Sequence, residues 1–192
     1  MIDYKHFPKN AVLLKEISKR ITDVAVRQSL NRYTYRYRLA NAFNGLDVTG
    51  IDKRTLRGYS AATKLFLAYT AYDEVRVAEK ILLDRKNPKL HHVFNFPLAH
   101  KIRRNKGLER LQKNSSAVTR ESLTKSVAKF YDEGNNEIMC IATAIRNCFA
   151  HGDLTAGGAD LDTVKAQVVV EELADAVMQK SNEIFNEILG QK

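Results

Sequence analysis

The chain is organised around the sequence IMCIATAIRNCFAHG, which spans residues 138–152. Its apolar residues recur at intervals of three and four, which is typical of one stripe of an amphipathic α-helix. The stripe consists of Ile138, Ile141, Ile145 and Phe149. Gly152 follows the last periodic residue, and glycine in that place commonly ends a helix in a left-handed conformation. The stretch therefore predicts a helix that begins at Asn135 or Asn136, ends at His151 and packs against a core.

The polar residues of this segment lie on other sides of the same helix. At about 100° per residue, Asn147 and His151 lie one turn apart on a shared face, and Arg146 lies about 100° round from Asn147. His151 is expected at the C-terminal end, where the partial negative charge of the helix favours a protonated imidazole. A structural interpretation stays open, in which Asn147 and His151 satisfy helix-end carbonyls and Arg146 forms a surface ion pair.

The composition favours helices along the whole chain. Only three prolines and nine glycines occur in 192 residues, and Leu, Ala, Glu, Lys and Arg are abundant, which argues for helices joined by short turns. A chain of this length buries a sizeable core in one domain. We therefore predict an all-α fold, a single-domain helical bundle of residues 1–192 with long antiparallel helices.

Apolar spacing and capping residues predict further helices. They cover residues 10–30, residues 53–84 with a break at 58–60 left open, residues 98–114, a short helix that starts near 123 and reaches Gly134, and a last helix from Asp160 or Asp162 to Leu189. In the last helix, a seven-residue repeat suits either the closing of a bundle or a dimer seam. The repeat consists of Val170, Val177 and Ile184, with Leu173 and Ile188 beside it.

A strong positive charge favours polyanionic partners. The chain has 31 Lys and Arg against 22 Asp and Glu, a formal net charge of +9, and neutralising phosphates releases condensed counterions. The predicted helix at 98–114 is the most basic segment. Its candidate RNA-binding residues are Lys101, Arg103, Arg104, Lys106 and Arg110. A solvated helix face explains the same residues equally well.

Tyrosine and arginine alternate in the sequence NRYTYRYRL of residues 31–39. This pattern suits RNA, because bases stack on tyrosine and arginine holds phosphate. Packing is the alternative, in which Tyr33, Tyr37 and Ala40 face inward while Arg32 and Arg36 form an exposed column.

Two glutamates stand out in the predicted helix of residues 53–84. Glu74 or Glu79 could orient a catalytic histidine or arginine from a facing helix. A charged column on a bundle helix is more commonly its solvated side, so neither glutamate is taken as a site residue.

Several kinds of site have no support in the sequence. It contains no Gly-rich phosphate loop, Cys-x-x-Cys, His-Glu-x-x-His or Gly-x-Ser-x-Gly motif, so P-loop, zinc-protease and serine-hydrolase chemistry are not indicated. Cys140 and Cys148 would lie about 12 Å apart along one helix, too far for a disulfide, and they are expected to be reduced core thiols. His91, His92 and His100 lack the accompanying ligands of a metal site. We expect neither a metal nor a cofactor.

No membrane segment is expected. The longest apolar run is far short of the roughly 18 residues that span a bilayer, and the first residues are unlike a signal peptide. These features indicate a soluble, cytoplasmic protein without a membrane partner.

The segment that contains Arg146, Asn147, three further residues, His151 and Gly152 resembles the signature of the HEPN superfamily. These are small all-helical domains that carry arginine, a polar residue, a short spacer and histidine. The match covers about ten positions, and the rest of the chain is similar only in helical character and length. The resemblance implies that residues 1–192 form one HEPN-like domain.

Arginine, asparagine and histidine at a helix end suit cleavage of a phosphodiester without a metal. Histidine transfers protons near neutral pH, and arginine holds a phosphate and offsets the charge of the transition state. RNA supplies its own nucleophile in the 2′-hydroxyl. The resemblance therefore implies a metal-independent endoribonuclease with Arg146, Asn147 and His151 as catalytic residues, Asn147 orienting His151 or a phosphate oxygen.

One histidine cannot easily act as both base and acid in a single reaction. HEPN ribonucleases commonly dimerise so that two motifs form a composite cleft, and the resemblance thus implies a homodimer that acts on RNA. It also allows a non-catalytic module that binds a nucleotide or a partner, for example beside a nucleotidyltransferase. An antitoxin, in a toxin–antitoxin or defence system, is a further partner of this kind. A purely structural bundle is the third hypothesis.

Overall fold

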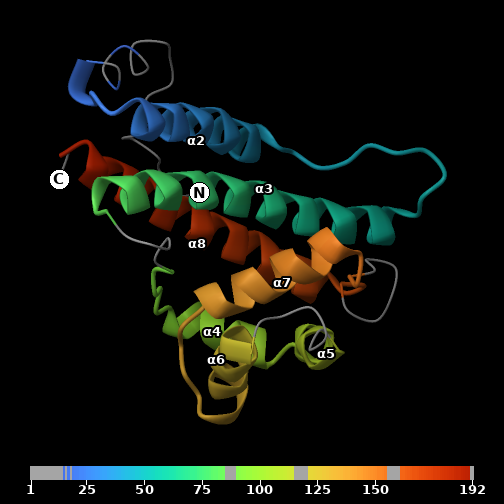
Figure 1. The fold of residues 1–192 in the computed structure, drawn as a ribbon. Helices are drawn as coiled ribbons and strands as arrows, with labels where there is room; N and C mark the ends of the chain where they lie inside the picture. Colours follow the sequence, from blue (N-terminus) through green and yellow to red (C-terminus); the bar gives the residue numbers. More distant parts are fainter. Residues whose placement is uncertain are drawn as a thin grey trace.

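The computed structural model describes residues 15, 17, 19–84, 90–114, 121–154 and 161–190, and in residues 111–114 only the course of the backbone. From Val24 onward these residues form seven α-helices and no strand (Figure 1). The helices are α2 (Val24–Ala42), α3 (Lys53–Leu82), α4 (Phe96–Arg103), α5 (Lys106–Asn114), α6 (Glu121–Asp132), α7 (Met139–His151) and α8 (Val164–Ile188). The predicted all-α helical bundle is confirmed.

Three long helices form the body of the bundle, with α3 between α2 and α8 (Figure 1). Helices α2 and α3 are antiparallel, since Ser29 contacts Glu74 whereas Arg36 reaches back to Thr70. Helices α3 and α8 run in the same direction, because Gln167 bonds to the carbonyl of Arg54 and Asp175 bonds to Lys64. The predicted antiparallel arrangement is therefore confirmed for α2 and α3 and is wrong for α3 and α8. Helices α3 and α8 therefore begin at the same end of the bundle.

Short polar side chains set the starts of the long helices. The carboxylates of Asp23 and Asp52 accept hydrogen bonds from backbone amides of α2 and α3, and the Thr163 hydroxyl accepts one from Ala166 in α8. Caps of this kind contribute about 1 kcal/mol each. For α8, the cap is Thr163 and not Asp162, while Asp160 lies outside the described residues.

The predicted helix of residues 10–30 is wrong in its extent. The backbone is not helical at residues 21–23, because Asp23 starts a new helix there by capping it. Helix α2 then continues through the tyrosine and arginine segment to Ala42. Residues 10–14 lie outside the described part of the chain.

The break left open at residues 58–60 does not occur, and α3 is continuous. The Ser60 hydroxyl donates to the carbonyl of Leu56 and accepts from the amide of Leu46. It thus tethers the α2–α3 connection to the helix without interrupting it.

The basic helix predicted at 98–114 is two helices, α4 and α5, separated at Arg104 and Asn105. The Asn105 side chain accepts from the amide of Leu108 and so starts α5. Asn95 starts α4 in the same way, two residues before Pro97. The basic residues therefore do not share one helical face.

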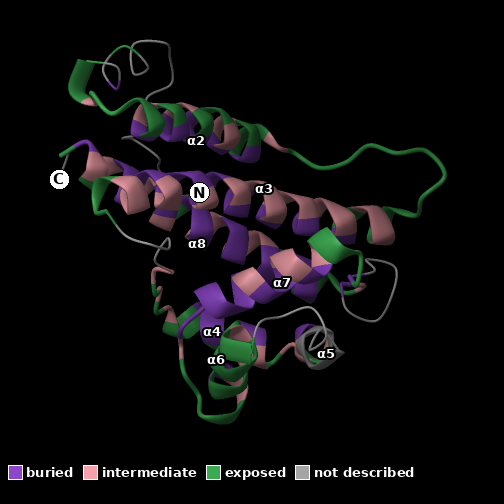
Figure 2. Cartoon of the chain, in the orientation of Figure 1, coloured by how far each residue is buried: buried purple, intermediate pink, exposed green. Residues whose placement is uncertain are grey.

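The core is formed by the facing sides of the helices (Figure 2). Tyr33 and Tyr37 of α2 are buried, which confirms the inward packing of these tyrosines. Arg32 is exposed and Arg36 is partly buried, and both pair with Glu74. Val170, Val177 and Ile184 of α8 are fully buried inside one chain. The seven-residue repeat therefore closes the bundle and does not form an exposed seam.

Cys140 and Cys148 are buried and are not joined in a disulfide, as expected. In the described residues, none of the helices has the length and apolar character needed to cross a membrane.

Candidate functional site

Helix α7, which carries the HEPN-like residues, is fixed at both ends. At its start, Glu137 accepts hydrogen bonds from the amides of Met139 (2.7 Å) and Cys140 (3.0 Å). At its end, Gly152 has a φ of 78°, and backbone amides of Gly152 and Asp153 bond to the carbonyls of Phe149 and Cys148. A side chain is therefore not needed to satisfy these two carbonyls, contrary to one part of the structural interpretation. The start of α7 at Met139 is later than predicted, because Glu137 caps the helix from outside it.

The apolar stripe of α7 faces the core as predicted. Ile138, Ile141 and Ile145 are fully buried. Phe149 is partly buried and lies 5.8 Å, between ring centroids, from Phe66 of α3. Full burial of an aliphatic side chain contributes roughly 1.5–3 kcal/mol, so this stripe fixes the rotation of α7 about its axis. The opposite side then presents its polar residues toward α3 and solvent.

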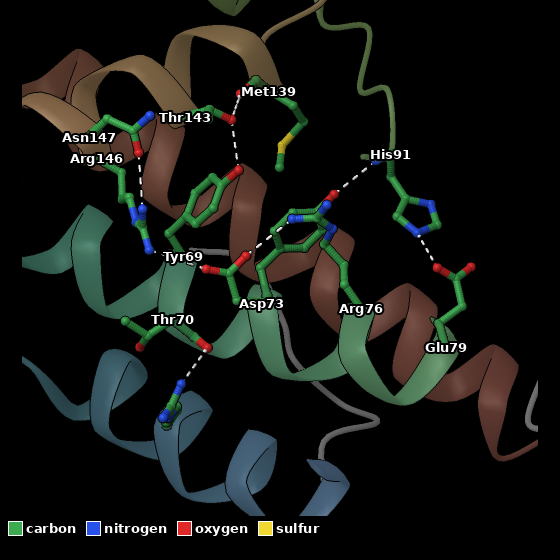
Figure 3. A network of polar contacts seen from close by, with 12 residues as sticks. Tyr69, Thr70, Asp73, Arg76, Glu79, His91, Met139, Thr143, Arg146 and Asn147 are labelled. Atoms are coloured by element: carbon green, nitrogen blue, oxygen red, sulfur yellow. Dashed lines mark hydrogen bonds and ion pairs between the residues drawn. The ribbon is translucent and has the colours of Figure 1, made fainter. Parts of the chain in front are cut away.

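Arg146 is held by three neighbours (Figure 3). Its Nη1 donates to Asn147 Oδ1 at 3.0 Å, and its Nη2 lies 3.4 Å from Asp73 Oδ2 on α3. The guanidinium also lies over the ring of Tyr69, with 5.5 Å from Cζ to the ring centroid. The expected ion pair of Arg146 is thus present, but its partner belongs to the polar face of α3.

The sequence predicts that Asn147 orients His151 or a phosphate oxygen. In the structure its Oδ1 accepts a hydrogen bond from Arg146 at 3.0 Å. This contact places the Asn147 amide against the guanidinium.

The polar face of α3 continues on the other side of Asp73. Arg76 Nη1 donates to Asp73 Oδ1 at 3.1 Å and lies over the Tyr72 ring, 5.1 Å from its centroid. Nearby, the hydroxyls of Tyr69 and Thr143 are 2.7 Å apart, and Thr143 donates to the carbonyl of Met139. These contacts join α3 to α7 through side chains of both helices (Figure 3).

Burial dominates the electrostatics of this face. Desolvation raises the pKa of Asp73, although Arg76 and Arg146 act in the opposite direction. Desolvation also raises the pKa of Tyr69, against the hydrogen bond that Tyr69 shares with Thr143. Both shifts mean that burial disfavours the ionised form of each side chain, the carboxylate of Asp73 and the phenolate of Tyr69.

All three candidate catalytic residues, Arg146, Asn147 and His151, line one open cavity of about 670 Å³. Its wall continues over Tyr69, Asp73 and Arg76 of α3 and Thr143 of α7, and then over Leu90 and the α6 residues Ser122, Leu123 and Ser126. His151 is exposed at the mouth of the cavity, at the end of α7. An imidazole in this position is accessible to a substrate.

The candidate RNA-binding residues lie apart from this cavity. Lys101 bonds to Glu172 at 2.7 Å, and Arg103 bonds to Asn136 at 2.8 Å and lies over the Phe130 ring. Arg104 lines a second cavity of about 590 Å³ between α4 and α8, together with Lys101. Lys106 and Arg110 are exposed on α5. Among the described residues, none of the five lines the cavity that contains Arg146.

Glu74 and Glu79 have structural partners away from His151. The Glu74 carboxylate is largely buried and pairs with Arg32 (2.9 Å) and Arg36 (3.0 Å) of α2. Glu79 does bond to a histidine, but this is His91, at 2.8 Å.

Sequence reasoning missed Asp73, Arg76, Tyr69 and Thr143. Asp73 and Arg76 are polar neighbours of Glu74 in the sequence, so the sequence contained a signal for a polar site on this helix. It did not indicate which side of α3 faces α7.

Among the described residues, no group of three or more His, Cys, Asp or Glu side chains has the arrangement of a metal site. Comparisons of the chain with protein-family models, with curated proteins and with solved structures find no match.

Proposed function

We propose that the protein is a metal-independent endoribonuclease of HEPN type. The observation that carries this proposal is that an exposed histidine, His151, opens on the same cavity as Arg146 and Asn147. A proton-transfer group and a cation beside one cavity are two of the groups that transesterification of RNA uses.

The reaction uses the 2′-hydroxyl of the RNA as the nucleophile. A base removes the proton of this hydroxyl, the 2′-oxygen bonds to the adjacent phosphorus, and the bond from phosphorus to the 5′-oxygen breaks. An acid gives a proton to the departing 5′-oxygen. The products are a 2′,3′-cyclic phosphate and a free 5′-hydroxyl, so that no water and no oxidant is consumed.

Each of the three residues has a distinct task in this scheme. His151 transfers a proton, because an imidazole that reaches the cavity can act as a general acid or base. Arg146 offsets the charge that builds on the phosphorane oxygens. Asn147 orients Arg146 through the 3.0 Å hydrogen bond and takes no part in proton transfer.

The proposal includes a homodimer, because base and acid are both needed in one turnover. A second copy of the chain would supply a second His151 across a composite cleft. The exposure of His151 at one end of α7 is compatible with such an approach.

The test is cleavage of end-labelled single-stranded RNA by the purified protein in excess EDTA. We expect fragments with cyclic phosphate and 5′-hydroxyl ends, and no cleavage of DNA or of 2′-O-methyl RNA of the same sequence. Intact RNA at protein excess would count heavily against the proposal. Cleavage of the substrates without 2′-hydroxyls would reject the mechanism.

The role of His151 is tested by substitution. His151→Ala should lower kcat by about 10² or more, which is the ordinary contribution of general acid–base catalysis. The matched control is His100→Ala, an exposed histidine on α4 that does not line the cavity, and it should cleave as the wild type does. Activity retained in His151→Ala would reject the assigned role.

A nucleotide-binding module without catalysis is the second candidate. It is favoured by the volume of the cavity, about 670 Å³, which falls in the range of small-molecule sites. In this case a mononucleotide should raise the melting temperature without turnover, and the partner would be a nucleotidyltransferase or an antitoxin. The absence of a shift with every nucleotide would exclude it.

A further inference from the structure

One face of α3 carries a repeated arrangement of tyrosine and arginine around a single carboxylate. Tyr69, Tyr72, Asp73 and Arg76 follow the spacing i, i+3, i+4 and i+7, which places them on one side of a helix. All except Tyr72 line the cavity that also contains Arg146 and His151. Helix α3 therefore presents a built polar surface to the candidate site.

The two arginines beside this surface are held in the same manner (Figure 3). Arg76 lies over the Tyr72 ring and donates to Asp73 Oδ1, and Arg146 lies over the Tyr69 ring and contacts Asp73 Oδ2. Each guanidinium thus has one aromatic face to stack on and one oxygen of the shared carboxylate to pair with. The two cations converge on Asp73 from α3 and from α7.

The pairing with Asp73 is loose enough for another anion to compete. Its two distances, 3.1 Å and 3.4 Å, exceed the 2.7–2.9 Å that is usual for charge-assisted bonds. The Arg146 and Asp73 side chains are 32% and 35% exposed and Arg76 is 14% exposed, so solvent partly screens the Arg146 pair. In addition, Arg146 Nε is buried with no hydrogen-bond partner among the described residues. A phosphate would give this donor an acceptor if the guanidinium turned toward it.

The charges on the cavity wall also favour an anion. Among the described residues, the cavity wall contains two guanidinium groups, an imidazole and the carboxylate of Asp73. Burial already disfavours the charge on Asp73, as its raised pKa indicates. The two guanidinium groups that share the Asp73 carboxylate thus lie in a partly dehydrated place, where charge-assisted hydrogen bonds to phosphate are strong.

We propose that Arg76 and Arg146 together bind one phosphate ester group, with Arg76 as a substrate-binding residue beside the HEPN-like motif. That the phosphate belongs to an RNA substrate rests on the proposed function, whereas the binding itself does not. The cavity is larger than a phosphate, and Leu90 and Leu123 with the hydroxyls of Ser122 and Ser126 line the remaining space. This space fits the sugar and base of a nucleotide, so the ligand is a nucleoside phosphate, either free or within a single strand.

The proposal is tested by binding, with substrates that cannot be cleaved. The probes are a fluorescent single-stranded 2′-O-methyl RNA, measured by anisotropy, and adenosine 5′-monophosphate, measured by calorimetry. Arg76→Gln should weaken binding of the RNA by about tenfold to a hundredfold, as expected for the loss of a hydrogen bond to a charged group. Arg57→Gln is the matched control, since Arg57 is an exposed arginine of the same helix outside the cavity. A site that requires a strand would bind the RNA and not the mononucleotide. A site that accepts phosphate from either source would bind both probes, and Arg76→Gln would weaken both.

A double-mutant cycle tests whether the two arginines share one phosphate. Arg146→Gln should weaken binding to a similar extent, and the double variant should be no more than about threefold weaker than the weaker single variant, because partners on one group are not additive. The slope of log affinity against log salt should fall by about 0.7 in Arg76→Gln, a change that a purely structural role would not produce. The melting temperature of each variant is measured in parallel.

Three outcomes separate this inference from the proposed function. If Arg76→Gln binds RNA as Arg57→Gln does, or keeps the wild-type salt slope, the shared phosphate site is excluded even where the wild type cleaves RNA. If Arg76 and Arg146 are both needed for binding and the wild type cleaves nothing, the site stands and the ribonuclease proposal fails. Multiplicative losses in the double variant would exclude a common phosphate.

Discussion

Two opposing influences act on the pKa of Asp73. Burial raises its pKa, and the guanidinium groups of Arg76 and Arg146 oppose the rise without cancelling it. The folded protein consequently binds this proton more tightly than the unfolded chain does. By linkage, the contribution of Asp73 to stability is fully present below the ordinary pKa of 3.8 and is lost as the pH rises through the raised value.

This linkage gives a prediction for Asp73→Asn. The unfolding free energy of the wild type minus that of the variant should decrease as the pH rises from about 3 through the pKa window and should then be constant up to about pH 7. Urea denaturation at a series of pH values measures this difference. The contributions of the other carboxylates to the unfolding free energy are the same in both proteins and cancel. A difference that instead grows with pH would mean that pairing with the two arginines outweighs burial.

Neighbouring residues show where prediction from sequence ends. The sequence indicates Glu74, and not Asp73, as an acid that could orient a catalytic side chain. In the structure Asp73 contacts Arg146, whereas Glu74 pairs with Arg32 and Arg36. The two positions differ by about 100° on the helix, and both directions are covered by other helices. The periodicity of apolar residues identifies the buried stripe of such a helix. It does not show which neighbouring helix each of its polar sides faces.

At the scale of the helix, the end of α7 decides where His151 lies. Gly152 has a φ of 78°, and a Cβ added there would meet nothing within 4 Å. The cost of a side chain at this position therefore comes from the backbone conformation alone and not from a clash.

Gly152→Ala should accordingly lower the unfolding free energy by about 1 kcal/mol. Gly152→Asn is the matched comparison and should lose less, because asparagine tolerates the left-handed conformation better. Denaturant titration of the three proteins measures both changes. Equal losses in the two variants would indicate that backbone conformation is not the cause.

Helix boundaries were predicted less well than helices. The apolar stripes of α7 and α8 follow from spacing, whereas spacing leaves the burial of Tyr33 and Tyr37 open beside an RNA-binding role. The starts at Val24 and Lys106 do not follow from spacing, because one Asp or Asn side chain turned inward to cap a helix decides each of them. Such polar residues occur throughout the chain, and only the folded backbone shows which of them cap.

At the scale of the whole molecule, the proposed reaction needs two copies of the chain. The specific RNA-cleaving activity should rise with protein concentration in parallel with the dimer fraction, since only the dimer contains both histidines. Sedimentation velocity and cleavage rates over the same dilution series make the comparison. Full specific activity at concentrations where only monomer sediments would contradict the composite site.

The parallel course of α3 and α8 has a consequence for synthesis on the ribosome. The α2–α3 hairpin is complete once residue 82 has emerged, but the helix that covers the other flank of α3 begins at Val164. At 5–20 residues per second, the hairpin waits for about 5–20 s before α8 is available. During that interval the side of α3 that α8 will cover lies open to water and to chaperones.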